Sequence, residues 1–103
     1  MYKLVFFVPE THLESVKSAV FATGAGKIGD YEHCCFETRG TGQFRPLAGA
    51  KPFIGETGKV ARVAEVKVEL VCSAELLSDA VSALRTAHPY EEPAFDAWPI
   101  MNL

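Results

Sequence analysis

The sequence predicts an α+β fold of the ferredoxin-like βαββαβ type, an antiparallel sheet with two helices on one face. Strand-like and helix-like segments follow one another as β-α-β and then β-α-β within 103 residues, a length that suits one domain with one core. The two helical segments also share an apolar pattern at an offset of 64 residues: Leu13, Val16, Ala19 and Val20 match Leu77, Ala80, Ala83 and Leu84.

The first half of the chain contains a strand, a helix and a second strand. Residues 4–8 are apolar throughout, which is typical of a central strand covered on both faces. Thr11 and Glu14 have the spacing of a capping box, so we expect a helix to begin there. Gly24 and the glycine two residues later end this helix. Residues 32–38 alternate loosely and predict the second strand.

The second half repeats this order. Residues 60–71 predict a longer strand with one polar face, because apolar and charged residues alternate along its later part. Ser73 is expected to cap the second helix, which His88 and Pro89 end. Residues 94–100 predict a short last strand, and the prolines around it favour the edge of the sheet.

The predicted sheet has one face that no helix remains to cover. Phe, Val and Tyr side chains on that face would be exposed in a single chain. We therefore expect a homo-oligomer, a dimer or a trimer, formed through the open sheet face.

A glycine-rich basic segment, residues 39–62, joins the two halves and is expected to be a long loop. It holds five of the eight glycines and five of the ten Lys and Arg residues, against one acid. Such a loop can direct backbone N–H groups and cations at one anion. The candidate ligand-binding residues are Arg39, Gly40, Gly42, Arg45 and Lys51. The alternative is an ordered excursion whose apolar residues pack together: Phe44, Pro46, Leu47, Pro52, Phe53 and Ile54.

Two clusters contain possible metal ligands. His88, Glu91 and Glu92 could hold a divalent ion, although a helix stop followed by a turn explains the same residues. His33 and Cys35 would share one face of the second strand and could contribute, whereas a buried cysteine acting as an apolar residue is the commoner outcome. A divalent metal is therefore a candidate cofactor, and no other cofactor is indicated.

Composition excludes several classes of function. The net charge of −3 argues against general nucleic-acid binding, and no apolar run is long enough for a signal peptide or a membrane span. Three cysteines, two of them adjacent, make a poor disulfide framework and indicate the reducing cytoplasm. No motif pairs a nucleophile with a base, so we expect a protein that is not an enzyme.

Four motifs together resemble a known domain. They are GAGKIGDY at 24–31, CFET at 35–38, GTGQFRPLAGAKPFIG at 40–55, and HPYEEP at 88–93. They resemble the domain inserted in YqfO-type proteins, which are described as NGG-interacting-factor-three-like or GTP cyclohydrolase type 2-like. The last motif is also similar to the copper-tolerance protein CutA.

The resemblance implies a single, stand-alone CutA/PII-like domain over residues 1–103, and an oligomer, since CutA and PII proteins form ferredoxin-like trimers. It implies no catalytic site, because the two-metal centre of the YqfO-type family lies in flanking domains. The leading hypothesis is a cytoplasmic, non-enzymatic, oligomeric regulatory or small-ligand-binding module that uses residues 39–62. The alternatives are a copper or zinc protein of CutA type and a structural or regulatory subunit of a partner enzyme.

Overall fold

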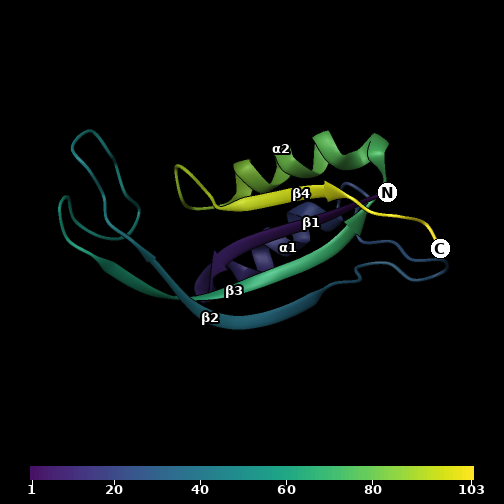
Figure 1. The fold of residues 1–103 in the computed structure, drawn as a ribbon, viewed down its shortest axis with the longest axis horizontal. Helices are drawn as coiled ribbons and strands as arrows, with labels where there is room; N and C mark the ends of the chain where they lie inside the picture. Colours follow the sequence, from purple (N-terminus) through teal and green to yellow (C-terminus); the bar gives the residue numbers. More distant parts are fainter.

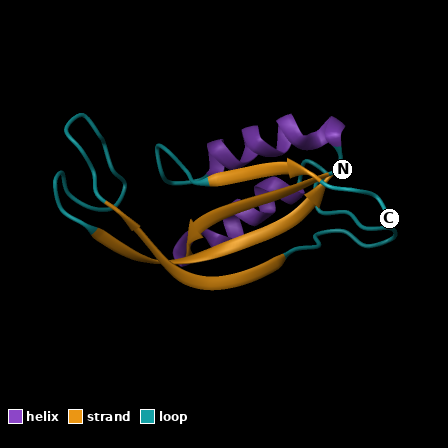
Figure 2. Ribbon diagram, in the orientation of Figure 1, coloured by secondary structure: helices purple, strands orange, loops and turns teal.

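The computed structural model describes residues 1–103 as a four-stranded antiparallel sheet with both helices on one side (Figures 1 and 2). The strands lie in the order β2-β3-β1-β4, so the predicted fold is confirmed. Short 3-10 turns, η1 (Glu10–His12) and η2 (Ala74–Leu76), precede the helices. The elements are β1 (Tyr2–Pro9), α1 (Leu13–Phe21), β2 (Phe36–Phe44), β3 (Ala61–Cys72), α2 (Leu77–Ala87) and β4 (Phe95–Pro99).

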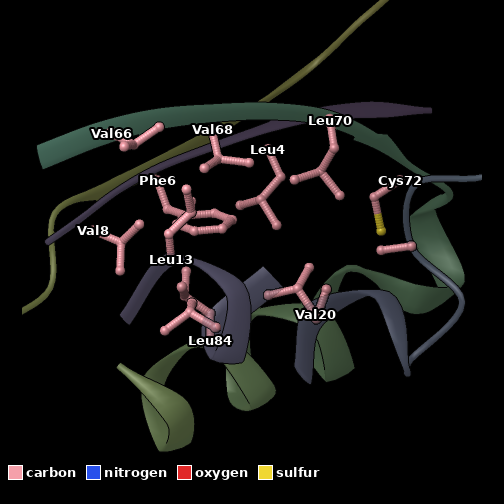
Figure 3. Packing of buried hydrophobic residues seen from close by; sticks show 13 residues of the cluster. Leu4, Phe6, Val8, Leu13, Val20, Val66, Val68, Leu70, Cys72 and Leu84 are labelled. Atoms are coloured by element: carbon pink, nitrogen blue, oxygen red, sulfur yellow. The ribbon is translucent and has the colours of Figure 1, made fainter. Parts of the chain in front are cut away.

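The two central strands supply the core face of the sheet. β1 and β3 pair antiparallel with Leu4 opposite Leu70 and Phe6 opposite Val68, so their apolar side chains point to the same side. The helices pack against that side through the apolar faces that the sequence predicts (Figure 3). The core cluster is Leu4, Phe6, Val8, Leu13, Val16, Val20, Ala25, Val66, Val68, Leu70, Cys72, Ala80 and Leu84.

The second strand differs from its prediction. It was expected at residues 32–38, but β2 runs over Phe36–Phe44 and so includes the first part of the segment expected to be a loop. The cause is β3, which is long enough to pair with every residue of β2, including Gly40 and Gly42. Only residues 45–60 remain as a loop. β3 and β4 lie within one residue of their predicted bounds at each end.

The predicted helix caps are also wrong. Thr11 makes no capping bond, and its hydroxyl instead lies 2.8 Å from Nδ1 of His12. Ser73 makes no side-chain cap either. In both places a 3-10 turn precedes the helix and satisfies a backbone amide that a side-chain cap would otherwise bind. The Leu13 amide donates to the carbonyl of Glu10, and the Leu76 amide donates to the carbonyl of Ser73.

The other sheet face has no helix over it. The strand register places Trp98 opposite Lys3 and Phe36 opposite Glu69 on this open face. Their exposed fractions are 45% and 69%. No helix of the chain has the length and apolar character needed to cross a membrane.

Candidate functional site

A groove lies where the β2–β3 hairpin meets the turn between α2 and β4. Its volume is about 660 Å³. One wall is the hairpin tip, residues 45–60, and the other is residues 88–94, which we call the HPY turn. The floor is the end of the open sheet face. The apolar lining includes Phe7, Phe44, Pro46, Leu47, Pro52, Phe53 and Ile54, and the charged lining is Arg45, Glu65, Glu91 and Glu92.

The hairpin tip is an ordered loop closed at its base. The Arg45 side chain donates from Nε to the carbonyl of Gly58 at 3.0 Å, and the Gly58 amide donates to the carbonyl of Pro46 at 2.7 Å. Gly58 has a φ of +78°, in the left-handed region that glycine enters at little cost. The ring of Phe53 contacts His12 edge-on at 5.3 Å, which connects the tip to η1. The tip is therefore fixed next to the body of the domain.

The HPY turn is held by a buried histidine. His88 is 5% exposed and donates from Nε2 to the carbonyl of Phe7 at 2.7 Å, while its Nδ1 accepts from the Tyr90 amide at 3.1 Å. Burial lowers the pKa of His88 below its ordinary value. A further bond joins the two walls, because the backbone amide of Lys51 donates to Oε1 of Glu91 at 2.9 Å.

Glu65 and Tyr90 form the polar part of the groove floor. The Tyr90 hydroxyl donates to Oε2 of Glu65 at 2.9 Å. Burial, and then the hydrogen bond and charge of Glu65, raise the pKa of the Tyr90 phenol, so it stays protonated as a donor. The ring of Tyr90 also meets that of Phe44 at 5.7 Å. The carboxylate lies over Gly42, where a Cβ atom would overlap it.

The residues predicted to bind an anion do not converge. Arg39 donates from a guanidinium nitrogen to Glu10 at 2.6 Å, and Arg45 is held by a backbone carbonyl. Lys51 contributes its backbone amide, to a carboxylate of the chain. Gly40 and Gly42 belong to strand β2, so they are not loop residues. Three carboxylates and one guanidinium line the groove, a charge that suits a cation better than an anion.

The residues predicted to bind a metal are not assembled as a centre within one chain. Both ring nitrogens of His88 are already hydrogen-bonded, and no group of three or more His, Cys, Asp or Glu side chains is placed to hold an ion. His33 precedes the strand, with a φ of +58°, and stacks on Phe21 at 5.0 Å. Its predicted sharing of a strand face with Cys35 is therefore wrong. Burial raises the pKa of the Cys35 thiol.

Sequence reasoning missed two residues of the site. Glu65 was read only as part of a polar strand face, and Phe7 only as part of a core strand. The role of Glu65 follows from the strand register, which brings it beside Gly40 and diagonal to Gly42. A charged residue followed by a buried valine gives no sequence signal for such a contact.

Comparison with known proteins identifies relatives over nearly the whole chain. No family model matches. The chain is 45% identical over 102 residues to a GTP cyclohydrolase 1 type 2 homolog of Halalkalibacterium halodurans, covering 99% of this chain and 27% of the relative. It is 50% identical over 99 residues to the homolog of Mycobacterium tuberculosis, covering 96% and 26%. The chain thus spans about a quarter of the length of these relatives.

Solved structures are also similar to this chain over nearly its whole length. A Bacillus cereus protein related to NIF3 superposes with a TM-score of 0.83 at 44% identity, over 98% of this chain and 26% of that one. The periplasmic divalent cation tolerance protein CutA from Archaeoglobus fulgidus gives a TM-score of 0.69 at 15% identity, over 99% and 86%. The resemblance to YqfO-type proteins and the CutA-like fold are confirmed. The chain is homologous to one domain-sized segment of the former.

Proposed function

We propose that this chain is a non-enzymatic binding module whose ligand site is the groove between the hairpin tip and the HPY turn. The observation that carries the proposal is the lining of the groove. Apolar side chains of the hairpin tip and the sheet surround the polar pair Glu65 and Tyr90 on the floor. This combination, at about 660 Å³, is typical of pockets for small ligands or for a short segment of a partner.

The titratable groups favour binding over catalysis. A general acid or base needs a pKa near the working pH and a proton it can exchange. The two nitrogens of His88 are occupied by backbone groups, and the raised pKa of Tyr90 keeps that phenol protonated, so it neither gives up its proton readily nor offers a phenolate as a base. None of the three free cysteines lines the groove. Free thiols also fit the cytoplasm as the compartment of this module.

A screen of small fragments of mixed charge, followed by amide chemical shifts, tests the proposal. Fragments that bind the groove should shift residues around Phe44, Phe53 and Tyr90 together. Phe53→Ser should weaken those shifts, since this ring is 55% exposed and lines the groove. The matched control is Tyr31→Ser, which removes an exposed ring outside both the groove and the sheet strands. No shifts at the groove, or equal effects of both variants, would reject the groove as the site.

We further propose that the module self-associates through the open sheet face. Phe36 and Trp98 are exposed on this face, near the end of the sheet away from Glu65 and Phe7. Association there would cover apolar surface and leave the groove free. Sedimentation velocity at micromolar concentration should give a dimer or trimer, and Trp98→Glu should lower the mass. A monomeric wild type contradicts this proposal and leaves the groove proposal standing.

Two alternatives have direct tests. Divalent metal binding would need ligands from a second chain, because His88 is fully engaged, and equilibrium dialysis against Cu²⁺ or Zn²⁺ tests it. A regulatory role toward a partner enzyme follows from the homologues, which are about four times as long. That role predicts binding of this chain to a Mycobacterium tuberculosis homolog from which the matching segment has been removed.

A further inference from the structure

We infer that the groove takes a ligand with a cationic nitrogen, an ammonium or guanidinium group, attached to an apolar body, and that Glu65 is the countercharge. This inference rests on the proposed binding function and specifies its ligand class. Three observations support it: a buried carboxylate with one oxygen unpartnered, no cation of the chain bonded to it, and a strand glycine that makes room for it.

Glu65 is nine-tenths buried, with an exposed fraction of 9%. A carboxylate offers about four acceptor positions on two oxygens. Oε2 accepts from the Tyr90 hydroxyl, whereas Oε1 has no hydrogen-bond partner in the chain. No fully enclosed side-chain oxygen or nitrogen lacks a partner, so Oε1 keeps some exposed surface, and Glu65 is part of the groove lining. Oε1 is thus the acceptor atom that Glu65 has left for a ligand in the groove.

No basic side chain neutralises this carboxylate. The six ion pairs of the chain involve other acids. Arg45, the one basic residue in the lining, donates from Nε to a backbone carbonyl instead. Burying a charge is costly unless it is paired and hydrogen-bonded. One neutral phenol therefore leaves Glu65 incompletely compensated, and a cation arriving in the groove would complete the pairing.

Gly42 makes room for the carboxylate. It lies on the open face of β2, diagonal to Glu65, and a Cβ atom there would overlap both carboxylate oxygens. Any other residue at this position would push the acid away from Tyr90. Gly42 has no positive φ, so its backbone does not demand glycine. Glycine is required at this position because the Glu65 carboxylate occupies the space that a Cβ atom would take.

The rest of the groove is suited to the apolar body of such a ligand. Phe44 and Ile54 come from the hairpin side, and Phe7 from the sheet. Glu91 and Glu92 add negative charge from the HPY turn. A ligand with its nitrogen at Glu65 and an apolar body along the hairpin tip would use both kinds of lining.

A charge series of one scaffold tests the inference. We would titrate phenethylammonium, 2-phenylethanol and phenylacetate into the wild-type chain at pH 7.5 and follow amide shifts. The cation should bind at least about tenfold more tightly than the alcohol. A hydrogen bond to a charged group is more stabilising than a neutral one, and the difference in free energy corresponds to roughly that factor in affinity. Phenylacetate should bind most weakly. Equal affinities with shifts at the groove would overturn the charge inference while leaving the proposed binding site intact.

Two variants place the charge effect on Glu65. Glu65→Gln keeps the size and an acceptor for Tyr90, and it should remove the preference for the cation. Glu69→Gln, on the same strand and face but outside the groove lining, should keep it. Gly42→Ala retains the charge but displaces it, so it should weaken the cation alone. Binding of the cation that survives both groove variants, or no binding of any probe to wild type, would overturn the inference. The fragment screen judges the groove separately.

Discussion

The body of the domain and its hairpin tip use apolar residues in opposite ways. In the body, Leu4, Phe6 and Val16 are fully buried between the sheet and the helices. In the tip, Leu47 and Phe53 keep exposed fractions of 67% and 55%, although the tip is closed by its own hydrogen bonds. The body uses its apolar side chains to fold, whereas the tip leaves large ones such as Leu47 and Phe53 available for contact.

The reason for this contrast is geometric. Both helices lie against one side of the sheet, whereas the β2–β3 hairpin extends past them (Figure 2). The domain is accordingly elongated, with extents of 46 × 24 × 23 Å. A hairpin outside the helical layer has no second layer to bury its side chains. Four predictions measure how strict the division is.

The largest effect is expected in the body. Phe6→Ala removes a fully buried ring and should lower the free energy of unfolding by about 3–5 kcal/mol, through lost burial and the cavity left behind. Urea denaturation followed by circular dichroism measures this. A loss below about 1 kcal/mol would mean that the core repacks freely, and the contrast between body and tip would not hold.

A backbone substitution should separate the two regions by a smaller amount. Gly26 has a φ of +84°, and a Cβ atom there would press on the Phe21 ring and the Cys34 carbonyl. Gly26→Ala should cost about 1–3 kcal/mol of unfolding free energy. Gly49, in the tip, has a φ of +96° but nothing within 4 Å, so Gly49→Ala should cost less in the same urea experiment. Equal losses would show that crowding contributes nothing.

The stability of the domain should depend on pH through His88, which connects the body to the site by its bonds to Phe7 and Tyr90. The pKa of His88 is lowered by burial, with a smaller contribution from His12, and Phe7 and Glu65 partly oppose the shift. The unfolded state, with a pKa near 6.5, therefore binds the proton more readily. The stabilisation is complete above that pH and is lost as the pH falls toward the folded pKa. Urea midpoints between pH 7.5 and 5 should decrease.

The control for this prediction is a second histidine. His88→Gln should flatten the decrease between pH 7.5 and 5, whereas His33→Asn should preserve it, because the His33 side chain is 61% exposed. Asparagine also tolerates the left-handed backbone at that position. An unchanged slope in His88→Gln would assign the pH dependence to other groups.

The smallest effect on stability is expected in the tip. Phe53→Ala removes a half-exposed ring and should change the free energy of unfolding by about 0.5 kcal/mol or less. The same variant should lose fragment binding at the groove. A large loss of stability would mean that the contact of Phe53 with His12 contributes to folding, and the tip would then resemble the body.

The sequence was sufficient for the body because local patterns decide it. The apolar run at residues 4–8 and the helical spacing of Leu13, Val16 and Val20 each report one element and its buried face. The repeat at an offset of 64 residues then limits the topology to two similar halves. The structure agrees with these local patterns because the same apolar residues pack together in the core.

The site was less accessible, because it depends on contacts between distant residues. The glycines at 40 and 42 have weak strand propensity, and β2 includes them because β3 continues opposite them. Gly42 suggested a flexible backbone, but its contact with Glu65, 23 positions away, concerns space instead. His88 suggested a metal ligand, and its two bonds to backbone groups appear only once the chain is folded.

The two hydrogen bonds of His88 also fix where its proton resides. A carbonyl can only accept and a backbone amide can only donate, so Nε2 carries the hydrogen and Nδ1 a lone pair. This single tautomer should give two well-separated ¹⁵N imidazole resonances. Nδ1 accepts a hydrogen bond from Tyr90, which lies at the floor of the groove. A ligand that moves Tyr90 should therefore change the ¹⁵N resonance of Nδ1.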